Sequence, residues 1–173
     1  MKRTLFEGRF LRLLDHDSWE FVERKNCTGI VIVIAVTEKK KVILIEQLRV
    51  PAGKKVIEFP AGLVNDRPNA KRETLKSAAF REFLEETGYR AKKMTELMSG
   101  PMNSGISSAR VTFFRAEGLK KMHEGGGDPT ESIMIHEVPL KKVDSWLKEI
   151  QKKGKAVDPK VYAGLYFLMR FFV

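Results

Sequence analysis

The chain has almost no cysteine, since Cys27 is the single one among 173 residues. One thiol excludes a disulfide within the chain and a zinc site built from cysteines. Because disulfides are rare in reducing compartments, we expect the protein to work in the cytoplasm. The three histidines, His16, His123 and His136, lack the spacing of a metal-binding group, so we expect each to be structural or exposed.

Long apolar runs are lacking as well. The longest, residues 30–36, is far shorter than the roughly 20 residues that cross a bilayer, and we expect no membrane association. No apolar stretch follows the basic N-terminus, so no signal peptide is expected. The 13 glycines show no period and the 11 phenylalanines can fill a core, which excludes collagen-like and disordered chains. The length predicts a single domain over residues 1–173.

Acidic residues are outnumbered, with 22 Asp and Glu against 32 Lys and Arg, for a net charge of +10. A basic balance suits nucleic acids, anionic surfaces and small phosphorylated substrates, and it does not choose among them. The lysines lie in scattered pairs beside the expected strands and helices, which favours a solvated basic surface. A nucleic-acid partner is therefore not expected, although composition alone leaves one open.

Apolar periodicity predicts a mixed α/β (α+β) chain made mostly of strands. β-branched residues indicate buried strands at 29–37 and 42–48, joined as a hairpin by a charged turn. The clearest helix covers residues 73–87 and ends at Gly88. We expect further strands at 8–14, 19–22, 56–59, 89–97, 109–116 and 132–138, and further helices at 140–153 and 159–173.

The helix at 73–87 carries acids on an unusual face. At about 100° per residue, Glu82 and Glu86 extend the face of Ala78 and Ala79, and Glu85 borders it. Mutual repulsion of the acids costs a few tenths of a kcal/mol, and Arg81 is expected to point away from Glu82. The pattern favours a cation from outside, for which carboxylate oxygens select Mg²⁺ or Mn²⁺. The alternative interpretation is a solvated helix end with incidental acids.

The longer motif around these acids resembles the Nudix box. The run from Arg81 to Tyr89 reads REFLEETGY, and seven residues separate Glu73 from Arg81. The box also places a glycine with five residues between it and the first Glu, but that position is Arg67 here. The nearest preceding glycine is Gly62, so we interpret residues 65–72 as containing a five-residue insertion, with the helix register kept.

Two flanking segments resemble the ADP-ribose pyrophosphatases and related nucleoside-diphosphate-sugar hydrolases. Residues 46–53 read EQLRVPAG and residues 57–63 read IEFPAGL, with Leu48 where these relatives carry Tyr. Residues 19–24 resemble their N-terminal arm. The resemblance implies the Nudix fold, an α/β/α sandwich around a mixed sheet. It also implies a β arm at about residues 1–25, and a homodimer.

The resemblance also implies roles in metal binding. Glu82 and Glu86 match the principal metal ligands, Glu85 matches a further acid, and the main-chain carbonyl of Ala61 matches a backbone ligand. Mg²⁺ is the implied cofactor, with Mn²⁺ as a substitute. Arg81 matches the residue that orients the acids.

Further residues are implied to handle the substrate. Arg49 matches a residue that approaches the diphosphate, and Glu58 is either an acid near the metal or a surface residue at a strand end. Trp19 is a candidate to stack on the base, often from the partner subunit in the relatives, whereas Phe21 is expected in the core.

The general base is expected in the loop at 124–131, which reads EGGGDPTE. Glu131, just before a strand, is the first candidate; Glu124, Asp128 and Glu137 are alternatives. The implied activity is metal-dependent hydrolysis of nucleoside diphosphate sugars, a small-molecule nucleotide substrate, to a monophosphate and a sugar phosphate. The alternatives are a pyrophosphohydrolase of RNA 5′ ends or (d)NTPs, and a non-catalytic module that binds nucleotide or RNA.

Overall fold

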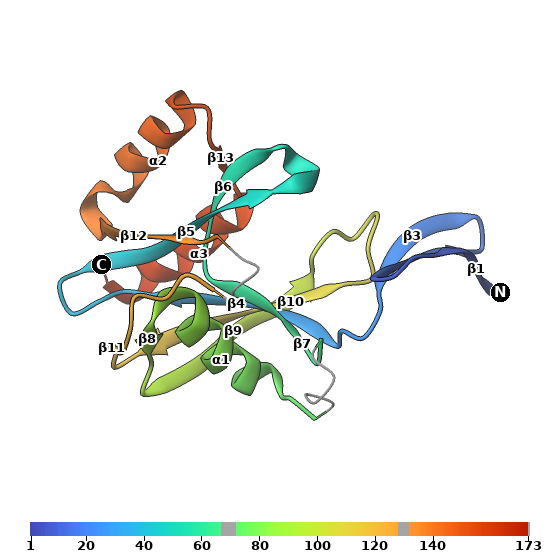
Figure 1. Cartoon of the computed structure of the whole chain (residues 1–173), viewed down its shortest axis with the longest axis horizontal. Coiled ribbons are helices and arrows are strands. Elements are labelled where there is room, and N and C mark those ends of the chain that lie inside the picture. Colours follow the sequence, from blue (N-terminus) through green and yellow to red (C-terminus); the bar gives the residue numbers. More distant parts are fainter. Residues whose placement is uncertain (67–71, 128–131, 173) are drawn as a thin grey trace.

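Alternate residues of strand β4 (Gly29–Ala35) face two different cores in the computed structural model, which describes residues 1–66, 72–127 and 132–172. Positions 30, 32 and 34 pack with helices α2 (Val143–Lys152) and α3 (Pro159–Phe172). Positions 31, 33 and 35 pack with helix α1 (Leu75–Thr87). Figure 1 shows α1 on one side of the strands and α2 with α3 on the other. The α/β/α sandwich is confirmed.

The sandwiched strands form two four-stranded sheets of mixed direction. The first has the order β7-β4-β10-β9, with β4 and β10 parallel. The second has the order β12-β5-β6-β13, with β6 and β13 parallel. A two-stranded ladder joins β8 (Tyr89–Arg90) to β11 (Lys120–Lys121). The remaining strands of the two sheets are β5 (Lys41–Arg49), β6 (Lys54–Glu58), β7 (Ala61–Val64), β9 (Lys93–Pro101), β10 (Arg110–Glu117), β12 (Met134–Pro139) and β13 (Ala156–Val157).

The predicted hairpin of residues 29–37 with 42–48 is wrong. The turn is present, because the Thr37 amide donates to the Lys41 carbonyl at 2.8 Å and Val36 bridges to Val42. Beyond that point the strands part, β4 between β7 and β10 and β5 between β6 and β12. Both are covered on their two faces, so their apolar pattern could not indicate which strands lie at their edges.

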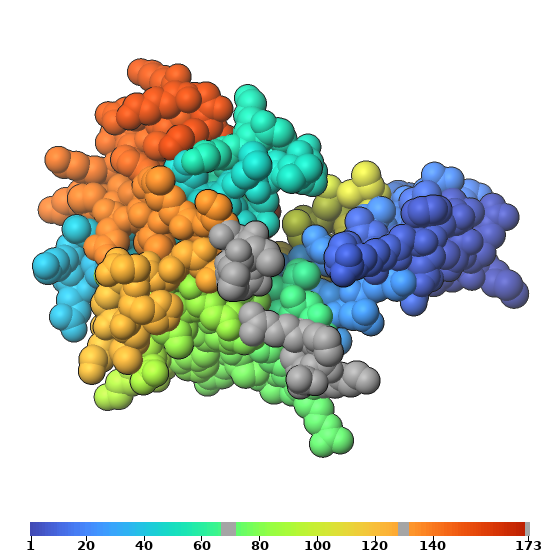
Figure 2. Space-filling view, viewed as in Figure 1, coloured from blue at the N-terminus to red at the C-terminus, as the bar shows by residue number. Residues whose placement is uncertain are grey.

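The N-terminal arm is a separate three-stranded antiparallel sheet of β1 (Lys2–Glu7), β2 (Leu11–His16) and β3 (Trp19–Arg24). Figures 1 and 2 show it projecting from the body as its own lobe. Its edge is attached to the body where the Val22 amide donates to the Ile106 carbonyl at 2.9 Å. The sequence predicted two of its strands, at 8–14 and 19–22, which correspond to β2 and β3. It missed β1, whose residues are all exposed and give no burial pattern.

Other element boundaries differ by small amounts. Helix α1 begins at Leu75 rather than residue 73, because Thr74 is its N-cap and forms a capping box with Ser77. It ends at Gly88, whose φ of +71° is the predicted left-handed end. The strand expected at 89–97 is divided into β8 and β9. Short 3₁₀ turns at Val50–Ala52 and Leu140–Lys142 precede β6 and α2.

No helix within the described part of the chain is long and apolar enough to span a membrane.

Candidate active site

The face of α1 that carries Glu82, Glu85 and Glu86, which we call the acid face, lies against the start of β7. Glu86 is only 2% exposed, and its Oε2 accepts a hydrogen bond from the Ala61 amide at 2.9 Å. A charge-assisted bond of this kind offsets part of the cost of burying a carboxylate. Glu86 and Ala61, both predicted to serve a metal site, are therefore brought together from helix and strand.

Gly62 makes room for the second principal acid. A Cβ at this position would lie 1.9 Å from Cδ of Glu82, closer than any real contact. Only glycine therefore allows the Glu82 carboxylate to approach the β7 backbone. Burial raises the pKa of Glu82 to about 7, although the neighbouring Arg81 acts in the opposite direction. The helix face, Gly62 and Ala61 thus enclose a carboxylate whose negative charge is poorly solvated.

Arg81 does not point away from Glu82, and the expectation of an acid cluster without a cation is wrong. Its Nη1 lies 2.7 Å from Glu82 Oε1 and 3.3 Å from Glu85 Oε2. The position of a Cα on the helix is separated by 100° from that of its neighbour, but the long side chain of arginine can bend across this angle. Arg81 thus contacts two of the acids, and its role in orienting them stays a prediction.

The other side of the Arg81 guanidinium is fixed by Glu73. Nε lies 2.7 Å from Glu73 Oε1, and Nη2 lies 3.0 Å from Oε2. Nη2 also donates to the Leu63 carbonyl of β7 at 3.1 Å. These contacts raise the pKa of Arg81 above its ordinary value, with the hydrogen bond to Glu73 as the largest cause. Glu73, whose role the insertion had left open, therefore holds Arg81 in place.

Asn65, directly after β7, is hydrogen-bonded to Glu73 in front of α1. Its Oδ1 accepts from the main-chain amide of Glu73 at 2.8 Å, and its main-chain amide donates to Glu73 Oε2 at 3.3 Å. Its Nδ2 donates to Thr28 Oγ1 at 2.7 Å, and its φ of +63° is left-handed. Residues 67–71 lie outside the described residues. These hydrogen bonds, which we call the Asn65 clamp, hold Glu73 in front of α1.

Arg49 and Glu58 form a pair on the neighbouring strands β5 and β6. Arg49 Nε lies 2.7 Å from Glu58 Oε2. Burial raises the pKa of Glu58, and the hydrogen bond from Arg49 opposes this rise. Glu58 is half-buried rather than a solvated strand end, and its role toward metal or substrate stays a prediction, as does that of Arg49.

Two of the four candidate bases, Glu124 and Glu137, lie among the described residues. Glu131 and Asp128 lie outside the described residues, and Glu124 is exposed in the loop that begins after β11. The Glu137 carboxylate accepts from the Tyr89 hydroxyl at 2.5 Å and lies 3.4 Å from Lys41 Nζ. The hydrogen bond from Tyr89 is the largest cause that lowers the pKa of Glu137. This carboxylate is therefore already engaged in holding β12 to β8.

Trp19 lies on the projecting arm rather than beside α1. It is 62% exposed, and its indole N–H donates to the Gly105 carbonyl at 3.3 Å. Within one chain Trp19 is therefore largely exposed to solvent. Stacking on a base stays a prediction that would involve a second subunit.

Glu46 is a buried acid to which sequence reasoning gave no role. Its Oε2 lies 2.9 Å from His136 Nε2 and 2.7 Å from Lys155 Nζ, and Trp146 packs on the His136 ring. The signal in the sequence was a carboxylate at the end of the apolar run 42–45. The cluster ties β5 to β12 and to the segment after α2, so His136 has the structural role expected of it.

The donor set of the acid face fits a hard divalent cation. Three carboxylates and the adjoining backbone of β7 offer oxygen ligands, which Mg²⁺ and Mn²⁺ prefer. Among the described residues no three His, Cys, Asp or Glu side chains already converge as a metal-binding group. The contacts account for this, because Glu82 and Glu85 turn toward Arg81 while Glu86 turns toward the Ala61 amide.

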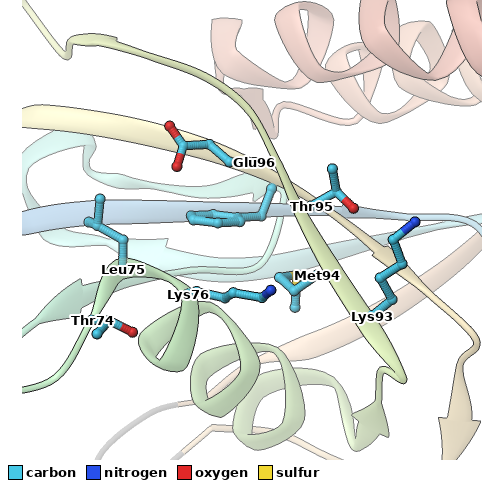
Figure 3. Close-up of a pocket in the computed structure, with 8 residues that line it drawn as sticks. Thr74, Leu75, Lys76, Lys93, Met94, Thr95 and Glu96 are labelled. Carbon is cyan, nitrogen blue, oxygen red and sulfur yellow. The ribbon is translucent and has the colours of Figure 1, made fainter.

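A cavity of about 550 Å³ lies elsewhere on the molecule. Figure 3 shows it between the start of α1, at Thr74–Lys76, and strand β9, at residues 93–96. Phe114 also lines it. The cavity adjoins the first turn of the helix, whereas Glu85 and Glu86 occupy the last turn, so it is distinct from the acid face.

Comparisons with known proteins agree with this geometry. The NUDIX domain family matches residues 27–162. The chain is 36% identical to the ADP-ribose pyrophosphatase of Bacillus subtilis, over 81% of this chain and 71% of that protein. It is 32% identical to the GDP-mannose pyrophosphatase of Escherichia coli K12, over 86% of this chain and 76% of that protein.

Two further proteins are similar, one over a smaller share of its length and the other at low sequence identity. The chain is 34% identical to the methanol dehydrogenase activator of Bacillus methanolicus over 70% of its own length, and it spans 63% of that protein. A crystal structure of an ADP compounds hydrolase superposes with a TM-score of 0.72 at 20% identity, covering 99% of this chain and 91% of that one. At this identity the superposition shows the fold alone.

Proposed function

The chain belongs to the Nudix family, and from this premise we propose that it hydrolyses the diphosphate bond of nucleoside diphosphate sugars, ADP-ribose or a related compound. The products would be a nucleoside monophosphate and a sugar phosphate. One observation carries the proposal: Glu82 and Glu86 converge on the β7 backbone at Ala61 and Gly62. The names of the Bacillus subtilis and Escherichia coli relatives support the substrate class.

Nudix hydrolases generally need divalent metal ions, and we propose Mg²⁺ here, with Mn²⁺ as a substitute. When bound, the ion neutralises diphosphate charge and lowers the pKa of the attacking water. Glu82, Glu86 and Glu85 would hold it together with the Ala61 carbonyl. Arg81 would keep Glu82 and Glu85 oriented, as its 2.7 Å and 3.3 Å contacts support.

Arg49 would bind the diphosphate of the substrate, and Glu58 would hold the Arg49 guanidinium in place. Their 2.7 Å contact supports this division of work, because a guanidinium fixed on one side can still donate from its other N–H groups. A carboxylate must take the proton of the attacking water. Glu131 is the proposed base, on the strength of its place between the glycine loop and β12, and Glu124 is the alternative.

We further propose a cytoplasmic homodimer in which the arm of one subunit reaches the other. Exposed Phe6, Phe10 and Trp19 on the arm support an interface there, since large apolar side chains seldom stay solvated together. The lone Cys27 supports a reducing compartment. Trp19 would then stack on the base of a nucleotide bound by the partner.

A substrate panel tests the proposal. ADP-ribose, ADP-glucose, UDP-glucose and GDP-mannose are compared with dNTPs and a 5′-triphosphorylated RNA, each with Mg²⁺ and with Mn²⁺. Turnover confined to the diphosphate sugars is the expected result. Preference for triphosphates or RNA would overturn it and would make the basic surface functional. Nucleotide or RNA binding without turnover of any substrate would instead indicate a binding module.

A further inference from the structure

One segment, residues 121–127, binds the whole C-terminal end of α1; we name it the glycine strap. The Gly127 amide donates to the Glu85 carbonyl at 3.1 Å and the Gly126 amide to the Glu86 carbonyl at 2.9 Å. Lys121 Nζ donates to the Thr87 carbonyl at 3.0 Å. The Met122 amide donates to the Gly88 carbonyl at 2.8 Å.

The strap can lie this close because a glycine stands at each point of closest approach, Gly125 in the strap and Gly88 at the helix end. Gly125, Gly126 and Gly127 have φ values of +74°, +112° and +83°. A Cβ on Gly125 would lie 2.5 Å from the Thr87 carbonyl carbon and 2.6 Å from the Glu86 oxygen. On the helix side, a Cβ on Gly88 would lie 1.9 Å from the His123 carbonyl oxygen. Helix end and strap are therefore fitted to each other backbone to backbone.

Simple capping does not require such an arrangement. A left-handed glycine alone closes a helix, and here the Gly88 amide already donates to the Leu84 carbonyl at 2.8 Å. Water can serve the remaining carbonyls at an exposed end. The strap instead bonds the main chain of Glu85 and Glu86, the two residues whose side chains belong to the acid face, and the loop with the candidate bases continues from it.

We propose that the glycine strap is a positioning element that fixes the stem of the base-carrying loop relative to the metal-binding helix. The inference rests on the proposed function, because it assigns the strap to the proton-transfer step of that reaction. A base must stand within hydrogen-bond reach of the water it deprotonates, so a displaced stem impairs the chemical step. The side chains proposed to bind substrate and metal are not part of the strap, so we expect both affinities to change much less than kcat.

Gly125→Ala tests the positioning role, and Gly154→Ala is its matched control. Gly154 has a φ of +79° and nothing within 4 Å of its Cβ position, so it carries the same backbone cost without a clash. We expect kcat to fall at least about tenfold in Gly125→Ala, with KM and the half-saturating Mg²⁺ concentration within about twofold of wild type. The control should keep kcat within about twofold. Equal losses in the two variants, or a loss confined to KM, would overturn the proposal.

A milder variant covers the case in which Gly125→Ala does not fold. Lys121→Met keeps roughly the length of the exposed side chain and removes the bond to the Thr87 carbonyl together with the cation–π contact to the Tyr89 ring. We expect a smaller fall in kcat, about threefold, again with KM unchanged. An unchanged kcat together with unchanged amide exchange in the strap would count against a positioning role for the segment.

A measurement without turnover separates the strap from the proposed function. In wild type, Mg²⁺ should shift the amide resonances of Gly126 and Gly127 with the same half-saturation as those of Glu85 and Glu86, while the Gly154 amide stays unmoved. If this coupling were found in a protein that hydrolyses no diphosphate sugar, the link between the strap and the metal-binding helix would stand and the proposed activity would be overturned. An active enzyme whose strap amides ignore Mg²⁺ would overturn the strap alone.

Discussion

Glu73 and Arg81 form a two-point ion pair, with Nε 2.7 Å from Oε1 and Nη2 3.0 Å from Oε2. Parallel contacts of this kind fix both the position and the plane of a guanidinium. Arg81 Nη1 is consequently left facing Glu82 and Glu85. The geometry of the acid face thus depends on a residue that stands before the first turn of α1.

The first prediction concerns the Asn65 clamp that holds Glu73. Asn65→Gly keeps the left-handed backbone and loses the side-chain bonds, so we expect a loss of about 1 kcal/mol in the free energy of unfolding. Asn65→Ala loses the same bonds and keeps a Cβ at φ +63° without the local hydrogen bonds by which Asn tolerates this conformation, so it should lose about 2 kcal/mol. Urea denaturation of both variants measures the difference. Equal stability of Asn65→Ala and wild type would show that the clamp carries no stabilisation.

The sequence was sufficient to predict that Glu82 and Glu86 share one face of α1, because helical periodicity alone places them together. It could not show which way Arg81 bends, since that depends on Glu73 and on the loop before the helix. Gly62 of β7 was identified as the nearest glycine before Glu73 although its spacing departs from the box, and the physical reason for a glycine there, the approach of Glu82, needed coordinates.

The partners of the strands could not be predicted from the sequence for a related reason. Residues 29–37 and 42–48 are apolar on both faces, so nothing in their pattern distinguishes a hairpin from two strands in separate sheets. Glu46 shows the same limit. Its partners, His136 and Lys155, lie about ninety residues or more further along the chain, and only the fold brings them together.

The second prediction removes a principal ligand. Glu86→Gln keeps the shape and the acceptor for the Ala61 amide but loses the charge, so kcat should fall by roughly three orders of magnitude while the melting temperature changes little. Glu96→Gln, on an exposed position of β9, is the control and should keep wild-type activity. Near-normal turnover by Glu86→Gln would remove the basis of the proposed metal site.

The third prediction locates the base. Glu131→Gln should lower kcat by on the order of a hundredfold with little change in the half-saturating Mg²⁺ concentration. Glu137→Gln should stay within a few-fold of wild type, because that carboxylate is held by Tyr89 and Lys41. Steady-state kinetics of these variants and of Glu124→Gln decides the assignment. A hundredfold loss in Glu124→Gln alone would transfer the role to Glu124.

The fourth prediction follows from Tyr89. Burial and the bond to Glu137 raise the pKa of its hydroxyl from 10.0 to about 12. Between these pH values the unfolded chain gives up the proton and the folded protein retains it. The contribution of Tyr89 to stability is therefore present below pH 10 and is lost as the pH rises through 12. An ultraviolet titration should show one of the three tyrosines ionising late, and Tyr89→Phe should abolish that late step.

The last prediction tests the approach of helix to strand. In Gly62→Ala the new Cβ would lie 1.9 Å from Glu82 Cδ, so the carboxylate must leave the β7 backbone. Removing a ligand from its place weakens metal binding itself, and we expect the half-saturating Mg²⁺ concentration to rise at least about tenfold together with a fall in kcat. This combination differs from that expected of a displaced base, where metal affinity is kept.

Gly100→Ala is the matched control for this variant. Its Cβ would meet the Met98 Cε at 3.6 Å, an ordinary contact at the flexible end of a side chain. The control should therefore bind Mg²⁺ and turn over substrate as wild type does. If Gly62→Ala also kept its metal affinity, metal binding would not depend on the position of the Glu82 carboxylate beside β7. The convergence of helix and strand at this point would then be packing rather than a binding site.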